Sequence, residues 1–147
     1  MTVIAWDGKT LAADRRGRME YNHIFEKMKL LRVDDCLVGF SGETALGGAM
    51  EKWLRDGRNP ETYPKGAGPN NCMLIVHPSG LIEQFEGLAF PIKIEGTQHA
   101  IGSGHAYARA AMFLGHDAIR AVDVACQFDS SCGNGIDSMT FSDGDAA

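Results

Sequence analysis

Three pairs of short apolar segments, each pair joined by a tight turn, constrain the fold of this chain more than any other feature. The turns are Asp7-Gly8, Asp34-Asp35 and Pro78-Ser-Gly80. Asp-Gly between two apolar runs is a typical hairpin signal, because a type I′ turn needs positive φ at both central positions. Strands joined in this way are antiparallel neighbours, so the sequence predicts largely antiparallel sheets. The predicted strands are residues 2–6, 9–13, 28–33, 36–41, 72–77 and 81–85.

A helix is predicted after the second pair of strands. Apolar residues recur at helical spacing from Leu46 to Leu54, which indicates a helix over residues 43–56 that ends at Gly57. The proline- and glycine-rich residues 57–70 are a predicted loop.

Two further helices are predicted near the end of the chain, over residues 105–114 and 118–127. A short strand at residues 99–101 precedes them and a closing strand at residues 136–141 follows. The residues expected on the inward faces of these helices are Tyr107, Ala110, Ala111, Leu114, Ile119, Val122 and Cys126.

The order of these elements predicts one α+β domain over residues 1–147, with a flexible tail at 142–147. A chain of 147 residues, 44% of them hydrophobic, is long and apolar enough for one core and too short for two. Hairpin-linked strands with helices grouped between them suggest helix layers packed outside two stacked sheets.

Charge and cysteine usage exclude several classes of protein. The net charge is −5 without any block of Lys and Arg, which argues against binding to nucleic acid or to an anionic membrane. The N-terminus has neither the basic nor the long apolar stretch of a secretory signal. The four cysteines form no Cys-x-x-Cys pair, so we expect reduced thiols in the cytoplasm, with neither a zinc site nor another cofactor.

Four stretches of the chain resemble, in order, the motifs of proteasome β subunits and of the HslV peptidase. They are Thr2-Val-Ile-Ala with residues 12–16, residues 29–33 with 37–42, residues 101–108, and Asp129-Ser-Ser-Cys-Gly133. The resemblance covers most of the chain and suggests a short bacterial or phage-type member. It implies an N-terminal-nucleophile (Ntn) hydrolase with a four-layer α/β/β/α sandwich of mostly antiparallel sheets and reduced helix layers.

Thr2 is the candidate nucleophile. A threonine hydroxyl needs a base, and removal of Met1 would give Thr2 its own base, the free α-amine with a pKa of about 7.7–8.0. The alternative is that Thr2 is the first residue of an edge strand.

Asp14 and Lys29 are the candidate partners of Thr2. A two-residue turn at Asp7-Gly8 would pair Thr2 with Ala13, and a three-residue turn would pair it with Asp14. An ammonium beside Thr2 would lower the pKa of the amine and of the hydroxyl, and Asp14 would hold that ammonium in place. Lys27, on the same strand face as Lys29, is the competing lysine.

The resemblance also implies roles for residues later in the chain. The Gly42 N–H, just before a helix, would bind the oxyanion. Ser103 would hydrogen-bond the Thr2 amine or cap a helix, and Asp129 would orient both. Cys132 stands where the family has serine, and it is also a candidate reactive thiol, although no histidine is well placed to activate it. The first specificity pocket is expected around Gly17, Lys27, Phe40 and Thr44.

The leading hypothesis is a threonine peptidase that hydrolyses peptides or unfolded proteins within a homo-oligomer, either a ring or a helical stack. Loop 57–70 replaces a helix of the family, so we expect a neighbouring subunit on the flank of the 46–54 helix. The resemblance raises an ATPase unfoldase as a partner, but the shortened helices weaken that transfer. The alternatives are a small-amide hydrolase of the same superfamily and a non-catalytic assembly protein with a decayed site.

Overall fold

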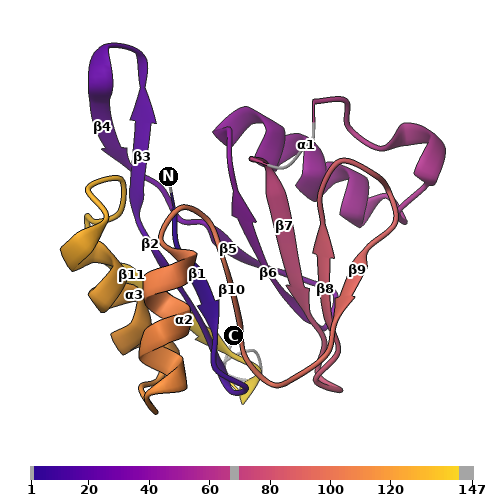
Figure 1. Ribbon diagram of the computed structural model, residues 1–147. Coiled ribbons are helices and arrows are strands. Elements are labelled where there is room, and N and C mark those ends of the chain that lie inside the picture. Colours follow the sequence, from indigo (N-terminus) through magenta and orange to yellow (C-terminus); the bar gives the residue numbers. More distant parts are fainter. Residues whose placement is uncertain (1, 67–69, 143–147) are drawn as a thin grey trace.

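The computed structural model describes residues 2–66 and 70–142 as two antiparallel sheets that face each other (Figure 1). A four-stranded sheet has the order β10-β1-β2-β11 and a five-stranded sheet has the order β5-β6-β7-β8-β9. The first sheet comprises β1 (Ile4–Trp6), β2 (Thr10–Asp14), β10 (His99–Ile101) and β11 (Ile136–Thr140). The second comprises β5 (Leu30–Val33), β6 (Cys36–Ser41), β7 (Cys72–Val76), β8 (Ile82–Phe85) and β9 (Ile92–Ile94). Of the tail predicted over residues 142–147, only Ser142 lies within the described residues.

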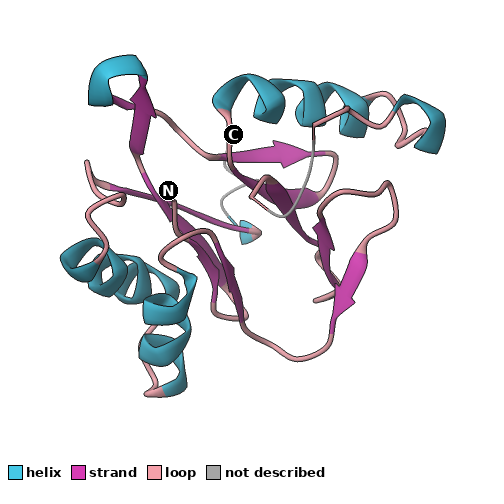
Figure 2. Ribbon diagram, turned by 45° about the horizontal axis from the view of Figure 1, so that its top comes forward, coloured by secondary structure: helices cyan, strands magenta, loops and turns pink. Residues whose placement is uncertain are grey.

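Helices cover the outer faces of both sheets, which gives the four-layer α/β/β/α sandwich (Figure 2). Helix α1 (Thr44–Arg55) packs on the five-stranded sheet through Met50, Trp53 and Leu54. Helices α2 (His105–Phe113) and α3 (Ala118–Phe128) pack on the four-stranded sheet. The α+β fold and the mostly antiparallel sheets are therefore confirmed. Loop 57–70 contains one short 3₁₀ turn, η2 (Pro60–Thr62), and its residues 67–69 lie outside the described part.

The space between the two sheets is filled by large apolar side chains, which place the first strands of the chain at the centre of the molecule. Ile4, Trp6 and Leu11 of the first sheet meet Leu37 and Leu74 of the second. Because side chains alternate along a strand, Val3, Ala5 and Ala12 face the other way, towards α2 and α3.

The first hairpin differs from both predicted registers. Its strands pair Ile4 with Ala13 and Trp6 with Leu11, and the Asp7 N–H donates to the Thr10 carbonyl (3.2 Å), so the turn is centred on Gly8 and Lys9. The Asp7 carboxylate holds this turn by accepting the N–H groups of Lys9 (2.8 Å) and Thr10 (2.7 Å). Gly8 has a positive φ of 101° but Asp7 does not, so the predicted type I′ turn is wrong.

The inward faces of α2 and α3 also differ from the prediction. Ala111 and Val122 are buried as predicted, and alanines make up most of the buried positions. The side chains of Tyr107, Ala110, Leu114 and Ile119 are exposed. Side chains as small as alanine let the helices lie close to the sheet, and a search for large apolar residues overlooks such a face. The buried residues of the two helices are Ala108, Ala111, Met112, Ala118, Ala121, Val122 and Ala125.

Two elements were not predicted: the edge strand β9, and a hairpin of β3 (Arg16–Met19) and β4 (His23–Glu26) joined by the turn η1 (Glu20–Asn22). This hairpin projects from the sandwich beside the N-terminal end of β1 (Figure 1). Its strands are largely exposed and carry charged residues, so they show none of the apolar alternation that signals a strand. None of the helices within the described ranges is long and apolar enough to cross a membrane.

Candidate active site

Thr2 lies just before β1 and is fixed from several sides although it belongs to no strand. Its carbonyl accepts the Gly104 N–H (3.1 Å) and its nitrogen donates to Ser103 Oγ (3.2 Å). The Lys29 ammonium donates to Thr2 Oγ1. Thr2 is 4% exposed, so its hydroxyl is both positioned and largely withdrawn from solvent.

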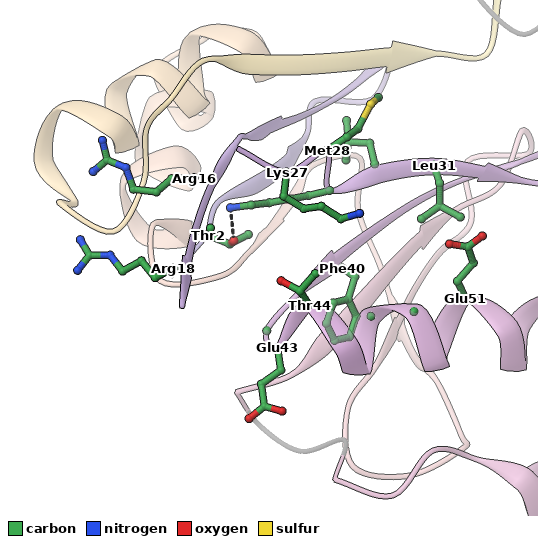
Figure 3. Close-up of a pocket in the computed structure, with 16 residues that line it drawn as sticks. Thr2, Arg16, Arg18, Lys27, Met28, Leu31, Phe40, Glu43, Thr44 and Glu51 are labelled. Atoms are coloured by element: carbon green, nitrogen blue, oxygen red, sulfur yellow. Dashed lines mark hydrogen bonds between the residues drawn. The ribbon is translucent and has the colours of Figure 1, made fainter. Parts of the chain in front are cut away.

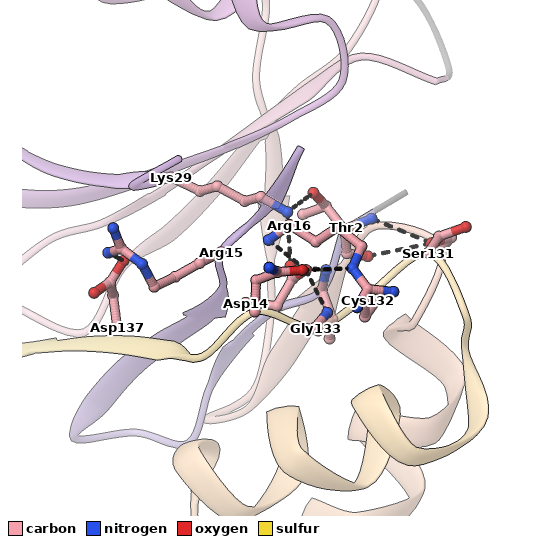
Figure 4. A network of polar contacts seen from close by, with 12 residues as sticks. Thr2, Asp14, Arg15, Arg16, Lys29, Ser131, Cys132, Gly133 and Asp137 are labelled. Atoms are coloured by element: carbon pink, nitrogen blue, oxygen red, sulfur yellow. Dashed lines mark hydrogen bonds and ion pairs between the residues drawn. The ribbon is translucent and has the colours of Figure 1, made fainter. Parts of the chain in front are cut away.

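Lys29 joins Thr2 to Asp14 (Figure 4). Its Nζ lies 2.7 Å from Asp14 Oδ1, and the side chains of the two residues are 8% and 0% exposed. The Lys29 carbonyl accepts the Phe40 N–H (3.2 Å), which anchors the residue just before β5. A single ammonium thus contacts the hydroxyl and the carboxylate at once, and Lys27 makes neither contact.

Asp14 is the most heavily hydrogen-bonded side chain of the site. Besides Lys29, its Oδ1 accepts the Val3 N–H (3.1 Å), and its Oδ2 accepts the N–H groups of Arg16 (3.2 Å) and Gly133 (3.1 Å). The carboxylate therefore ties the start of β1 to the end of β2 and to the loop before β11.

Ser103 and Asp129 form a second group of polar contacts on the far side of the Thr2 nitrogen. Ser103 Oγ donates to Asp129 Oδ2 (2.7 Å), and Ser131 N–H donates to Asp129 Oδ1 (2.9 Å). Partial burial alone would raise the pKa of Asp129, but these hydrogen bonds hold it below its usual value. Ser103 does not cap α2: the N-cap residue is Gly104, without a side-chain hydrogen bond.

Cys132 packs beneath this group. It is 2% exposed, and its Sγ contacts Asp129 Oδ2 at 3.5 Å. Burial and the neighbouring carboxylates of Asp14 and Asp129 raise the pKa of its thiol to about 12. Such a thiol stays protonated near neutral pH, which disfavours its role as a nucleophile.

Gly42 stands at the turn from β6 into α1 with a φ of +141°. A Cβ at this position would collide with Asn71, whose Oδ1 accepts the Glu43 N–H at 2.9 Å. Among the described residues no group accepts the Gly42 N–H. The turn thus presents a backbone donor near the start of a helix, an arrangement that suits a developing negative charge.

A cavity of about 480 Å³ opens beside Thr2, between helix α1 and residues 27–31, which lead from β4 into β5 (Figure 3). All four residues predicted for the specificity pocket line it, namely Gly17, Lys27, Phe40 and Thr44. Thr2, Lys29 and Gly42 line the same cavity, whereas Asp14, Ser103, Asp129 and Cys132 lie behind Thr2.

Some residues of the site had no signal in the sequence. Asn71 supports the Gly42 turn from a separate loop, and the Gly133 N–H reaches Asp14 across 119 positions of sequence. Gly47 and Gly48 of helix α1 also line the cavity, and their lack of side chains leaves space on that side. The apolar spacing that predicts the helix does not indicate this role.

Comparisons by sequence give no assignment: no protein-family model and no curated protein matches the chain. Comparisons of structure, in contrast, find similar proteins over nearly the whole chain. Thiobacillus denitrificans BPH in complex with epoxomicin matches with a TM-score of 0.73 and 19% identity, covering 95% of this chain and 97% of that one. HslV from Trypanosoma brucei matches with a TM-score of 0.69 and 21% identity, covering 95% and 98%.

A third match is an Anbu (Gly-1) mutant from Hyphomicrobium sp. strain MC1, with a TM-score of 0.71 and 14% identity, covering 95% of this chain and 81% of that one. All three proteins are proteasome-type N-terminal-nucleophile hydrolases. The fold is shared over nearly the whole chain although few residues are identical. The chain therefore has the fold of the proteasome-type N-terminal-nucleophile hydrolases.

Proposed function

We propose that this protein is a threonine peptidase whose nucleophile is Thr2 after removal of Met1. The observation that carries the proposal is the single Lys29 ammonium that contacts Thr2 Oγ1 and the buried Asp14 carboxylate. This arrangement places a positive charge where a threonine hydroxyl must lose its proton.

In the proposed reaction Thr2 Oγ1 attacks the carbonyl carbon of the peptide bond. The hydroxyl proton passes to the free α-amine of Thr2, and the positive charge of Lys29 favours the unprotonated amine that receives it. The oxyanion receives the Gly42 N–H. The protonated amine then gives its proton to the leaving nitrogen as the C–N bond breaks.

An ester between Thr2 and the acyl part of the substrate remains. Water attacks this ester, with the amine again as the base, and the acid is released from Thr2. Ser103 contributes by accepting a hydrogen bond from the Thr2 nitrogen, and Asp129 holds the Ser103 hydroxyl in that position.

We also propose that the protein acts in the cytoplasm as a homo-oligomer. Support comes from the aromatic and aliphatic side chains that α2 and α3 expose, Phe113, Leu114 and Phe128 among them. The outer flank of α1, in contrast, exposes no large apolar side chain within the described residues, so the flank expected to need a subunit is not the apolar one.

The proposal is tested by intact-mass measurement followed by labelling with a peptide epoxyketone, a class of compound that BPH binds as epoxomicin. The epoxyketone forms its ring adduct with a hydroxyl and a free amine on the same residue. We expect a mass without Met1 and an adduct on Thr2 that is lost in Thr2→Ala. A retained Met1, an adduct on Cys132, or peptide cleavage that survives Thr2→Ala would contradict the proposal.

A further inference from the structure

The cavity beside Thr2 carries more positive than negative charge. Arg16, Arg18 and Lys27 line it, and none of the three has a carboxylate partner in the part of the chain that the structure describes. Both arginines donate to the Ser130 carbonyl, and Arg16 also donates to the Asn134 side-chain oxygen. These acceptors hold both guanidinium groups on the side directed away from α1 (Figure 3), so the arginines lie at the rim of the cavity and their charges do not point into it.

The carboxylates along the cavity do not offset this excess. Glu51 is paired with Arg55 one helical turn away, with Nε and Oε2 3.0 Å apart. Glu43 is the other carboxylate of the lining, and its side chain points away from Phe40 and Thr44 (Figure 3). Lys27 therefore contributes an unpaired positive charge to the cavity of a chain whose net charge is −5.

Lys27 is the cation best placed to act on a bound side chain. Its ammonium has no hydrogen-bond or ion-pair partner among the described residues. Its side chain runs along the strand side of the cavity towards Leu31, opposite α1 (Figure 3). Apolar groups of Leu31 and Phe40 line the space around it, whereas the Met28 side chain points to the other side of the strand (Figure 3). A side chain with a short aliphatic section and an anionic end matches this combination.

The position of Thr2 decides which substrate residue meets Lys27. Attack requires the carbonyl carbon within about 3–3.5 Å of Thr2 Oγ1. With the carbonyl oxygen directed at the Gly42 N–H, the residue that carries this carbonyl lies at the mouth of the cavity. Its side chain extends into the space lined by Phe40 and Lys27.

We propose that this cavity selects an acidic side chain, glutamate above all, on the residue whose carbonyl Thr2 attacks, and that Lys27 determines this specificity. The inference rests on the peptidase reaction proposed above and names its substrate class. Phe40 and Leu31 contact the methylene groups of the glutamate, and Lys27 contacts its carboxylate.

The first test uses fluorogenic peptides that differ only in the residue before the leaving group: Glu, Gln, Leu or Lys. Because an ion pair at a solvent-accessible site contributes up to about 1 kcal/mol, we expect kcat/KM for Glu to exceed that for Gln by about fivefold. Lys27→Met removes this preference and Lys27→Glu shifts it towards the Lys peptide. Added salt weakens the preference of the unmodified enzyme, because exposed charges are screened.

Lys93→Glu is the matched control. It makes the same change in net charge on β9, at a lysine that does not line the cavity. We expect Lys93→Glu to keep the Glu-over-Gln ratio. A ratio that Lys27→Met leaves unchanged, or that Lys93→Glu changes as much as Lys27→Glu, would overturn the inference.

A binding experiment separates failure of the inference from failure of the proposed reaction. Fluorescence anisotropy with the Thr2→Ala variant compares labelled peptides that carry Glu or Gln and requires no cleavage. Tighter binding of the Glu peptide that disappears in Thr2→Ala/Lys27→Met supports the inference even if no peptide is hydrolysed. Equal binding of the two peptides contradicts it even if Thr2 forms its epoxyketone adduct.

Discussion

At the scale of single residues, Asp14 organises the candidate site although it does not face the cavity. It receives hydrogen bonds from the backbone at Val3, Arg16 and Gly133 and an ion pair from Lys29. A buried carboxylate that accepts hydrogen bonds from separate segments is held in one position. Its ion pair with Lys29 then fixes the position of the Lys29 ammonium. The contact between Lys29 and Thr2 is therefore a consequence of packing around Asp14.

The sequence was sufficient to name these residues but not to place them. Asp14 was expected near Thr2 from the hairpin, yet the turn is centred on Gly8 and Lys9, so that Asp14 lies next to Val3 in the ladder. The carboxylate reaches the site through Oδ1, which accepts a hydrogen bond from Lys29 Nζ (2.7 Å). Asn71 and Gly133 support Glu43 and Asp14 from segments far away in the sequence. A local sequence pattern cannot predict contacts between such distant segments.

The Thr2 series tests the chemistry at this scale. Thr2→Ala should abolish turnover and leave the fold intact, because the lost hydroxyl is the proposed nucleophile. Thr2→Ser should keep part of the activity, because both the hydroxyl and the amine remain. Lys29→Ala should lower kcat by several orders of magnitude. Peptide hydrolysis assays together with far-UV circular dichroism check these outcomes, and full activity of Lys29→Ala would argue against the mechanism.

Asp14→Asn tests the organising role of the carboxylate. Removing one partner of a buried ion pair leaves the other charge unpaired, at a cost of about 3–5 kcal/mol in the free energy of unfolding. Lys29→Met in the same background removes the stranded charge and should recover part of this loss. Urea denaturation of the single and double variants measures both effects, and strict additivity would show that the two residues are not coupled.

At the scale of elements, the segments were predicted more reliably than their faces. The strand pairs around Asp34-Asp35 and Pro78–Gly80 appear as hairpins β5–β6 and β7–β8, and Gly57 follows the end of α1 with a positive φ. The inward faces of α2 and α3 were predicted only in part: Ala111 and Val122 are buried as expected, but most of the other buried positions are alanines that the prediction did not include. Strands β3 and β4 were not predicted, because exposed strands with charged residues lack the alternation of apolar and polar residues that indicates a strand.

Two adjacent glycines of α1 provide a matched pair of variants. A Cβ on Gly48 would meet nothing within 4 Å, whereas a Cβ on Gly47 would lie 2.7 Å from Phe40 Cδ1. Gly48→Ala should stabilise the protein by about 0.5–1 kcal/mol, because alanine loses less backbone freedom in a helix. Gly47→Ala should gain less or destabilise, because the Phe40 ring must move. Thermal unfolding of both variants measures the change in stability. An equal increase in stability from Gly47→Ala and Gly48→Ala would contradict the predicted clash with Phe40.

Glu83, on strand β8 of the five-stranded sheet, links three elements. It is buried on β8 and binds Arg58 after α1 (3.1 Å) and His77 after β7 (2.5 Å). Burial alone would raise the pKa of Glu83, but the hydrogen bond with His77 and the charge of Arg58 hold it below its usual value.

A depressed pKa in the folded state means that ionised Glu83 contributes stability above its unfolded pKa of about 4.3. That contribution is lost as the pH falls through the lower folded value. Glu83→Gln should therefore cost about 1–3 kcal/mol at pH 7, and the difference from the unmodified protein should shrink below about pH 4. Urea unfolding at several pH values measures this, and a pH-independent difference would rule out the ionic origin.

At the scale of the whole molecule, the apolar surface is distributed unevenly. The layer of α2 and α3 exposes Phe113 (86%), Leu114 (75%) and Phe128 (69%), and Phe128 stacks on Tyr107 with ring centroids 5.7 Å apart. These helices turn their alanines inward and their large side chains outward, which inverts the usual arrangement of a surface helix. A face of this kind is typical of an interface.

Self-association through this face is the prediction that belongs to this scale. Light scattering over a dilution series should show an assembly larger than the 15.9 kDa chain. Phe113→Ser with Phe128→Ser should shift it towards monomer, because the exposed apolar area that drives association is lost. Leu88→Ser, at an equally exposed side chain after β8, serves as the control and should leave the assembly unchanged. A chain that stays monomeric at every concentration would remove the need for a partner copy, and the outward aromatic side chains would then require another explanation.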